Sequence, residues 1–382
     1  MDIRIAEEIQ GLYEEVKEIY RKLHREPELG FNVHKTASFV AQYLRDLGLE
    51  VTEGIGRTGV VGILRGEGSC IMFRADMDAL SIQEDNDLPF KSINPGMMHA
   101  CGHDSHTAML LVAAKVLSKT PNLKGTIKFV FQPSEEALPG GAIEMINDGV
   151  LDNVDEVYGI HVGKPLNTGD YLYNTKYASM SCDKFEVKII GKGGHGSCPE
   201  STKDPIPVAA SMIQLFSNIS ANRQRPIRCQ TNIVKTSDTF NAIPTNVTLV
   251  GSTRSLVPED RDYIEKRMKT IVRGFEVAHN MKIDINYERG YGSVVNNEKC
   301  GNWCLKTIES ITSGKRYDEI IAFSEDFSYF SDRKPGAFLV LGCGLSEFGN
   351  HTSRFFIDEQ VLLIGVSYWV ELAKNRLSGE VS

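Results

Sequence analysis

The chain has 382 residues, of which 41% are hydrophobic and 24% are charged. This length allows one large domain or two ordinary domains, with enough core to be stable without disulfide or metal staples. The net charge of −8 argues against nucleic acid or an anionic membrane as the main partner.

The sequence also indicates a compartment. No apolar segment reaches the length needed to span a bilayer, and the first residues lack the apolar stretch of a secretory signal. The eight cysteines are scattered along the chain, without the spacing of a small disulfide-bonded domain. We therefore expect a cytoplasmic protein with no membrane association.

The first part of the chain alternates helical and extended patterns. Apolar residues at helical spacing predict helices over residues 3–25, 33–47, 108–114 and 140–148. Short β-rich runs predict strands at 60–64 and 71–73, and further strands are expected at 126–131 and 156–161. Strands that alternate with helices favour an α/β fold, in which a mostly parallel sheet is flanked by helices.

Polar side chains follow these predicted strands. Asp76, Asp78, Glu135, Glu136 and His161 all lie at or just beyond the ends of apolar runs. Sheets of this class place their sites beyond the carboxyl ends of the strands. We therefore expect these side chains to meet at one edge of the sheet.

The pattern changes near residue 177. The predicted elements are then a strand at 184–190, a helix at 207–219, strands at 229–234 and 246–253, a helix at 258–278 and a strand at 282–287. This is the order of a ferredoxin-like α+β domain. The first architecture resumes near 290, with helices at 299–310 and 358–375 and a strand at 337–341. We expect a catalytic domain of residues 1–176 plus 290–382, interrupted by an inserted domain of residues 177–289.

Ligating side chains are concentrated in residues 98–106, which hold one thiol and three imidazoles. Cys101 and His103 alone can be a small polar turn, and a lone histidine after a strand is more often a core residue. One cysteine, one glutamate and three histidines at element ends, however, form a set suited to zinc, manganese, cobalt or nickel. That set is Cys101, His103, Glu136, His161 and His351. Ligands from distant elements are typical of a catalytic site with open positions.

If Glu136 binds the metal, its neighbour Glu135 lies beside the metal and can act as a general base. A metal lowers the pKa of its bound water towards ~7, and a carboxylate can then remove the proton during attack on a carbonyl. The same carboxyl group can hand that proton to the leaving nitrogen. The rival reading is a Cys101 nucleophile with His103 or His106 as base, which leaves Glu135, Glu136 and His161 without a role.

At this point the chain resembles the M20 family of metallopeptidases, in its aminoacylase, hippurate hydrolase and auxin-conjugate hydrolase branch. The matching stretches are RADMDAL (74–80), MHACGHD (98–104), QPSEE (132–136), GIH (159–161), GKGGHG (191–196), NAIP (241–244) and HT (351–352). Each motif alone is short and a weak signal. The ordered set, which spans nearly the whole chain, is specific for the family. The resemblance implies a zinc-exopeptidase-like catalytic domain with an inserted lid and dimerisation domain.

The resemblance also implies two metal ions per subunit, with Cys101 as the bridging ligand and Glu135 as the general base. The remaining ligands that it implies are His103, Glu136, His161 and His351. In the lid, His195 is implied to reach a partner subunit's active site and stabilise the oxyanion. Asn241 and Arg254 resemble substrate-contacting positions, and Arg254 is suited to pair with a carboxylate. An ordinary exposed strand arginine is the alternative reading of Arg254.

Two departures from the family pattern are visible. Ser81 stands where relatives usually have proline, and residues 197–200 replace a stretch that often carries a second histidine. The expected activity is hydrolysis of the amide bond of N-acyl amino acids by a homodimer or higher homo-oligomer. A dipeptidase or carboxypeptidase of the same fold is the near alternative, and a non-catalytic binding module is the distant one.

Overall fold

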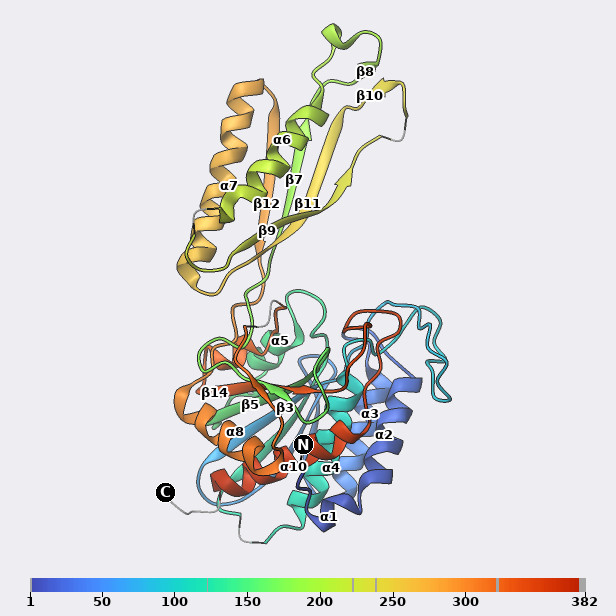
Figure 1. Cartoon of the computed structure of the whole chain (residues 1–382), viewed down its shortest axis with the longest axis vertical. Helices are drawn as coiled ribbons and strands as arrows, with labels where there is room; N and C mark the ends of the chain where they lie inside the picture. Colours follow the sequence, from blue (N-terminus) through green and yellow to red (C-terminus); the bar gives the residue numbers. More distant parts are fainter. Residues whose placement is uncertain (1, 122, 222, 238, 321–322, 378–382) are drawn as a thin grey trace. The chain divides into compact units, whose positions relative to one another are not determined.

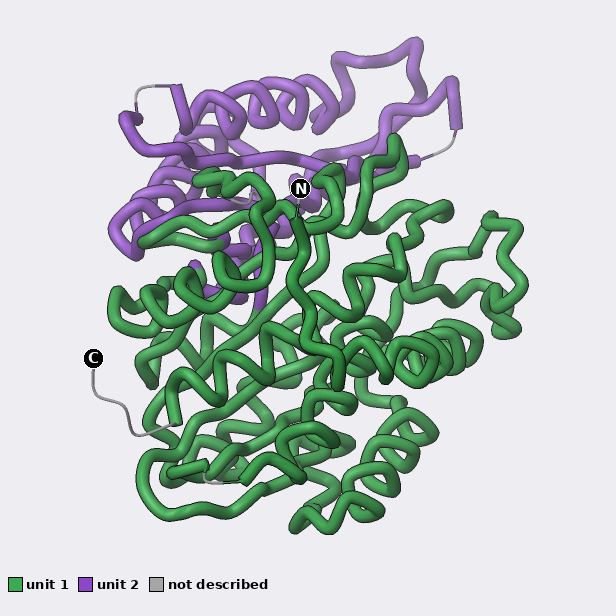
Figure 2. Tube along the Cα trace, turned by 60° about the horizontal axis from the view of Figure 1, so that its bottom comes forward, with its two compact units in different colours: residues 1–178, 294–320, 326–382 green, residues 179–293, 321–325 purple. Residues whose placement is uncertain are grey.

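The computed structural model describes residues 2–121, 123–221, 223–237, 239–320 and 323–377. The chain divides into two compact units, coloured separately in Figure 2. Leaving aside the undescribed positions, unit 1 comprises Met1–Ala178, Val294–Ile320 and Asp326–Ser382, and unit 2 comprises Ser179–Ser293 and Ile321–Glu325. No helix among the described residues is long and apolar enough to cross a membrane.

Unit 1 is built on an eight-stranded sheet of order β1-β2-β4-β3-β5-β14-β6-β13. Its strands are β1 (Glu50–Ile55), β2 (Gly59–Leu64), β3 (Cys70–Asp76), β4 (Thr126–Gln132), β5 (Glu156–Gly163), β6 (Tyr171–Leu172), β13 (Arg316–Tyr317) and β14 (Gly336–Gly342). The central strands β4, β3, β5 and β14 are parallel. Their carboxyl ends therefore face the same edge of the sheet.

The helices of unit 1 flank this sheet (Figure 1). They are α1 (Glu7–Gln10), α2 (Tyr13–Arg25), α3 (His34–Asp46), α4 (His103–Ser118), α5 (Gly141–Asn147), α8 (Glu298–Ile311), α9 (Ser328–Ser331) and α10 (Gln360–Leu377). Helix α4 is buried at every residue from His103 to Ala114, because α2 and α10 pack on it from one side and β3 from the other. A helix that is apolar on all faces belongs in such an interior position.

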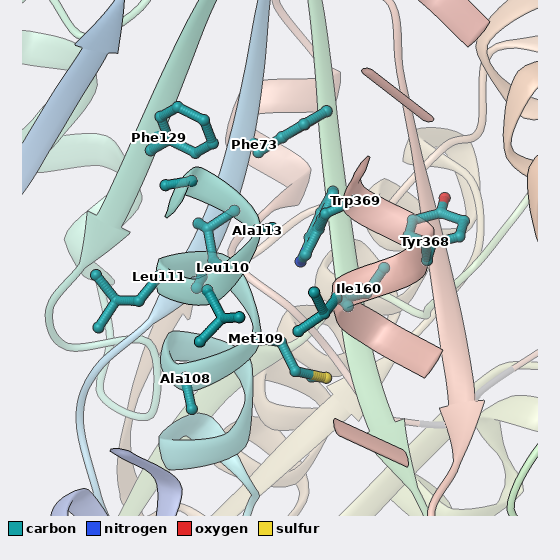
Figure 3. Packing of buried hydrophobic residues seen from close by; sticks show 14 of the residues in the cluster. Phe73, Ala108, Met109, Leu110, Leu111, Ala113, Phe129, Ile160, Tyr368 and Trp369 are labelled. Carbon is teal, nitrogen blue, oxygen red and sulfur yellow. The ribbon is translucent and has the colours of Figure 1, made fainter. Parts of the chain in front are cut away.

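Figure 3 shows the core around α4. Phe73 of β3 and Trp369 of α10 are both fully buried, and their ring centroids lie 4.6 Å apart. Met109 and Leu110 of α4 lie in the same cluster. This packing fixes the start of α4, where the predicted ligand His103 is located, relative to β3.

Unit 2 contains a four-stranded antiparallel sheet of order β12-β7-β11-β9. Its elements are β7 (Asp183–Ile190), β8 (Gly194–His195), α6 (Pro205–Ser217), β9 (Arg228–Lys235), β10 (Ala242–Ile243), β11 (Asn246–Arg254), α7 (Pro258–His279) and β12 (Lys282–Arg289). Strand β7 alternates buried and exposed residues, and its buried face packs in a separate core with residues of α6 and α7. The strand order and the two crossover helices are those of a ferredoxin-like domain.

The predicted fold class is confirmed: a mostly parallel α/β unit carries a ferredoxin-like unit. One predicted helix was wrong in extent. The stretch of residues 3–25 contains two helices, α1 and α2, because the chain leaves helical geometry at Leu12, between them. The N-terminal end of that stretch instead bridges to the region after α8, where Ile3 pairs with Thr312.

Candidate metal centre

The carboxyl-terminal edge of the central strands carries the predicted ligands of unit 1. His161 lies within β5, near its carboxyl end, and Glu135 and Glu136 follow β4. Cys101 lies just before α4 and His103 is the first residue of that helix. Gly102 between them has φ 92°, and an added Cβ would lie 2.4 Å from Cγ2 of Val162. Glycine is therefore required for both neighbouring side chains to face the same point.

Two ligand triads share the thiol of Cys101. One consists of Cys101, His103 and His161, and the other of Cys101, Glu136 and His351. The Sγ atom of Cys101 lies 3.3 Å from Nε2 of His161 and 3.3 Å from Nε2 of His351. His351 Nε2 lies 3.2 Å from Oε1 of Glu136. Tetrahedral zinc with bonds of about 2.0–2.3 Å separates its ligand atoms by roughly this distance.

The two triads differ in access to solvent. All three residues of the first triad are buried, whereas Glu136 is partly exposed and His351 is exposed. The second triad is therefore the more solvent-accessible of the two. A position open to substrate distinguishes a catalytic site from a closed structural one.

Hydrogen bonds to backbone carbonyls orient two of the histidines. Nδ1 of His103 lies 2.7 Å from the carbonyl oxygen of Asp78, and Nδ1 of His161 lies 2.7 Å from that of Val162. A carbonyl only accepts, so each Nδ1 carries the proton and each Nε2 presents its lone pair to the site. Burial also lowers the pKa of His161 well below its usual value, which keeps that ring neutral, as a ligand must be.

The residues present fit a divalent metal. Among the described residues, Nε2 of His103 is a buried atom without a hydrogen-bond partner, and such an atom is costly unless another group satisfies it. Burial, and next the charge of Glu136, raises the pKa of the Cys101 thiol. The raised pKa means that ionising this buried thiol costs free energy. A metal ion compensates this cost because it binds the thiolate directly.

Two non-glycine residues at the site have left-handed backbone conformations. Ser134, just before Glu135, has φ 53°, and His351 has φ 65°. Such conformations cost of order 1–3 kcal/mol and are concentrated at functional sites, where the surrounding structure enforces them. One of the two residues is His351 itself, a member of the second triad, and the other directly precedes Glu135.

Asp78 holds the glutamate pair in place. Its Oδ1 accepts the backbone N–H of Glu135 at 2.9 Å, and its Oδ2 accepts that of Glu136 at 3.2 Å. The backbone N–H of Asp326 in turn points to Oε1 of Glu135, at 3.4 Å. Carboxylate oxygens of Glu135 and Glu136 and a ring nitrogen of His103 lie within 4.8 Å of one another. The sequence pattern had indicated no defined role for Asp78 or Asp326.

A buried ion-pair network lies behind the ligands. Arg74, 1% exposed, donates to Oδ2 of Asp76 at 2.7 Å and to Oδ1 of Asp326 at 2.8 Å. Oδ1 of Asp76 lies 2.6 Å from Nδ1 of His106, whose Nε2 accepts the backbone N–H of Val162. Burial raises the pKa of Asp326 to about 6 despite its arginine partner. His106 thus supports the strand that carries His161.

His99, the third imidazole of the 98–106 stretch, makes no ring-nitrogen hydrogen bond with any residue that the structure describes. It is 2% exposed, and burial lowers its pKa to about 4. A neutral packed imidazole is the role that its surroundings support.

The other three predicted site residues lie in unit 2. His195 in β8 pairs with Ala242 in β10, next to Asn241, and the N–H of Gly196 donates to the carbonyl of Asn241 at 2.8 Å. Arg254 is the last residue of β11, at the opposite end of that strand from Asn246. There it donates to the hydroxyl of Ser324 at 2.6 Å. The fold therefore brings His195 and Asn241 together at the two-stranded antiparallel sheet of β8 and β10, and places Arg254 at the far end of β11.

Comparison with known proteins agrees with this architecture. The model of peptidase family M20/M25/M40 matches residues 72–375. The chain belongs to this family. It is 36% identical over 389 residues to a hippurate hydrolase of Campylobacter jejuni, covering 98% of this chain and 100% of the relative. It is 40% identical over 304 residues to an N-acyl-L-amino acid amidohydrolase of Geobacillus stearothermophilus, covering 76% and 81% of the two chains.

Among solved structures, a Bacillus subtilis protein described as a dinuclear metal-binding peptidase of family M20 superposes with a TM-score of 0.84. The two chains share 29% identity, and the superposition covers 97% of this chain and 99% of the other. The resemblance to family M20 is confirmed, as is the prediction of a metal-dependent amidohydrolase.

Proposed function

We propose that the chain hydrolyses the amide bond of N-acyl amino acids, releasing a carboxylic acid and an amino acid. The observation that carries the proposal is the pair of ligand triads on Cys101, with the carboxylate of Glu135 beside them. The two similar amidohydrolases named above act, by their descriptions, on hippurate and on N-acyl-L-amino acids.

Two divalent ions per chain complete the proposed site. Cys101, His103 and His161 hold one, and Cys101, Glu136 and His351 hold the other, with zinc, manganese, cobalt and nickel as the candidates. When bound, such ions acidify a water molecule and polarise the substrate carbonyl.

Glu135 carries the proton in this proposal. Its carboxylate removes one proton from the attacking water as the C–O bond forms, and then delivers that proton to the amide nitrogen as the C–N bond breaks. Asp78 keeps the carboxylate beside the ligands, because both backbone amides of the 135–136 pair donate to it. No net proton is gained or lost by the chain.

The proposed roles in unit 2 follow the family resemblance. His195 donates a hydrogen bond to the oxyanion in a partner subunit's site, and Asn241 and Arg254 contact substrate. Arg254 is suited to a substrate carboxylate because its guanidinium can make two parallel hydrogen bonds. This arrangement requires a homodimer or a higher homo-oligomer that associates through unit 2.

A reducing, cytoplasmic location is part of the proposal. All eight cysteines lie in the described part of the chain, and each is a free thiol. Free thiols persist in reducing compartments, and a bridging Cys101 must be reduced to bind metal.

A dipeptidase is the second candidate, because the family is described as one of peptidases. A hydrolysis screen on metal-reconstituted protein separates the two. N-acetyl and N-benzoyl amino acids should be cleaved with a higher kcat/KM than dipeptides that carry the same C-terminal residue. Faster cleavage of the dipeptides would replace the proposal with the peptidase activity, and cleavage of neither class would remove both.

A further inference from the structure

The loop that follows β8 contains the residues 197–200 that depart from the family pattern, and one of them contacts His195. The hydroxyl oxygen of Ser197 lies 2.7 Å from Nδ1 of the His195 ring, and the backbone N–H of Ser197 points to the same nitrogen at 3.2 Å. A backbone N–H can only donate, so Nδ1 is an acceptor. In the neutral ring the proton must then be on Nε2.

We propose that Ser197 is a positioning residue that holds His195 in the tautomer with its proton on Nε2. The inference rests on the proposed function, in which His195 donates a hydrogen bond to the oxyanion. Only the tautomer with an Nε2 proton can donate from the outer end of the ring. The other neutral tautomer would present a lone pair to the developing negative charge and oppose it.

Backbone contacts fix the position of the His195 main chain, but they do not fix the orientation or the tautomer of its ring. His195 pairs with Ala242 across the two short strands, and Gly196 donates to Asn241. The side chain of His195 is exposed, so packing does not restrain it. Ser197 supplies two donors from a position two residues along the same loop.

The hydroxyl of Ser197 has one proton, which is used towards His195. Sγ of Cys198 lies 3.7 Å from the same hydroxyl oxygen, so in that contact the thiol is the donor and Ser197 the acceptor. The serine that departs from the family pattern therefore has a defined orientation in the loop. An alanine at this position would leave the backbone N–H as the remaining donor to Nδ1.

The direct test is the tautomer of His195 in the full-length, zinc-loaded protein. The ring nitrogens of the nine histidines are labelled with nitrogen-15, and His195 is assigned from the signal lost in His195→Gln. At a pH where the ring is neutral, long-range proton–nitrogen NMR correlations should place the wild-type proton on Nε2. Ser197→Ala should raise the fraction with the proton on Nδ1, and Ser197→Thr should restore the wild-type pattern.

Ser201→Ala is the matched control, because the hydroxyl of Ser201 donates to the carbonyl of Cys198 in the same loop and not to the ring. It should leave the tautomer unchanged. The proposal is overturned if His195 keeps its wild-type tautomer in Ser197→Ala. It is also overturned if Ser201→Ala raises the fraction of His195 with its proton on Nδ1 as much as Ser197→Ala does.

Kinetics test the consequence separately. Loss of one neutral hydrogen bond should lower kcat of Ser197→Ala by about threefold to tenfold with KM unchanged, since the oxyanion forms only in the transition state. A shifted tautomer with wild-type kcat would overturn the catalytic consequence. Failure of the proposed function would show differently, as a wild-type protein that hydrolyses no N-acyl amino acid while the tautomer result still stands.

Discussion

The Sγ atom of Cys101 lies 3.3 Å from Nε2 of His351, although 250 positions separate the two residues in the chain. His161, within β5, places its own Nε2 at the same distance from the thiol. Cys101 therefore lies between two histidines that come from different parts of unit 1. A thiolate at that position can bind two cations at once, and this gives the residue its importance in the proposed site.

Replacement of Cys101 by serine should remove both metal ions. A serine hydroxyl is shorter and a poorer ligand for the candidate metals than a thiolate, and both triads contain this residue. We expect metal content below one ion per chain and a loss of activity of at least about 100-fold, since even changes around a ligand cost 10–100-fold. Metal analysis after dialysis measures the metal content per chain. The control is Cys182→Ser, a change outside both triads, which should behave as wild type. Two retained ions in Cys101→Ser would show that the thiol is not a bridge.

Asp78→Asn should lower turnover without unfolding the chain. The amide that replaces one oxygen would face a backbone N–H donor, so one of the hydrogen bonds to Glu135 and Glu136 is lost. We expect kcat to fall by about 10–100-fold, as measured at saturating substrate. Asp85→Asn, at an exposed position on the following loop, is the matched control. Equal activities of the two variants would mean that Asp78 does not position the pair.

Part of this site could be predicted from the sequence and part could not. Apolar runs before Glu135 and around His161 mark buried parallel strands, and the carboxyl ends of such strands share an edge, so those residues could be placed together. His351 lies in a loop and follows no predicted strand, so it could be counted among the candidate ligands by its side chain but could not be placed beside Cys101 from the sequence pattern. Asp326 was not among the predicted site residues, because its hydrogen bond to Glu135 depends on tertiary packing.

The same limit applies to local structure. The two-residue strands β8 and β10 are too short to produce an alternating pattern, so the pairing of His195 with Ala242 was not predicted. The break at Leu12 was missed because the apolar residues of α1 and α2 keep helical spacing across it. In unit 2 the long strand β7 could be predicted from its alternating sequence, since one of its faces is buried and the other is exposed.

A buried histidine should make stability depend on pH. His24 lies 2.7 Å from Oδ2 of Asp104 and 3.2 Å from Oε1 of Glu84. Burial opposes its protonation, but the two carboxylates outweigh burial and raise its pKa to about 9. The charged ring therefore contributes stability that is complete below pH ~6.5, the unfolded value, and is lost as pH rises through about 9.

This contribution is on the order of 3 kcal/mol, and urea unfolding at several pH values can measure it. The difference in unfolding free energy between wild type and His24→Gln should shrink from pH 6 to pH 9.5. Groups elsewhere titrate in both proteins and cancel in the difference. A difference that stays constant over this range would show that His24 is not charged in the folded chain.

Chelation should inactivate the protein and lower its melting temperature. Without a cation, the buried Nε2 of His103 has no hydrogen-bond partner, and a ligand that binds only the folded state stabilises it. Activity should return with zinc, manganese, cobalt or nickel, and calorimetry with and without metal should show the thermal shift. Full activity in protein shown to be free of metal would revive the reading of Cys101 as a nucleophile.

The most direct test of the account is the Glu135→Gln variant, measured for metal content and turnover together. Glutamine keeps the shape of the side chain but cannot accept and return the proton. Since Glu135 is the proposed base and belongs to neither triad that shares Cys101, the variant should retain wild-type metal content while kcat falls by about 10²–10⁴-fold. A variant with full metal content and near wild-type turnover would contradict the account.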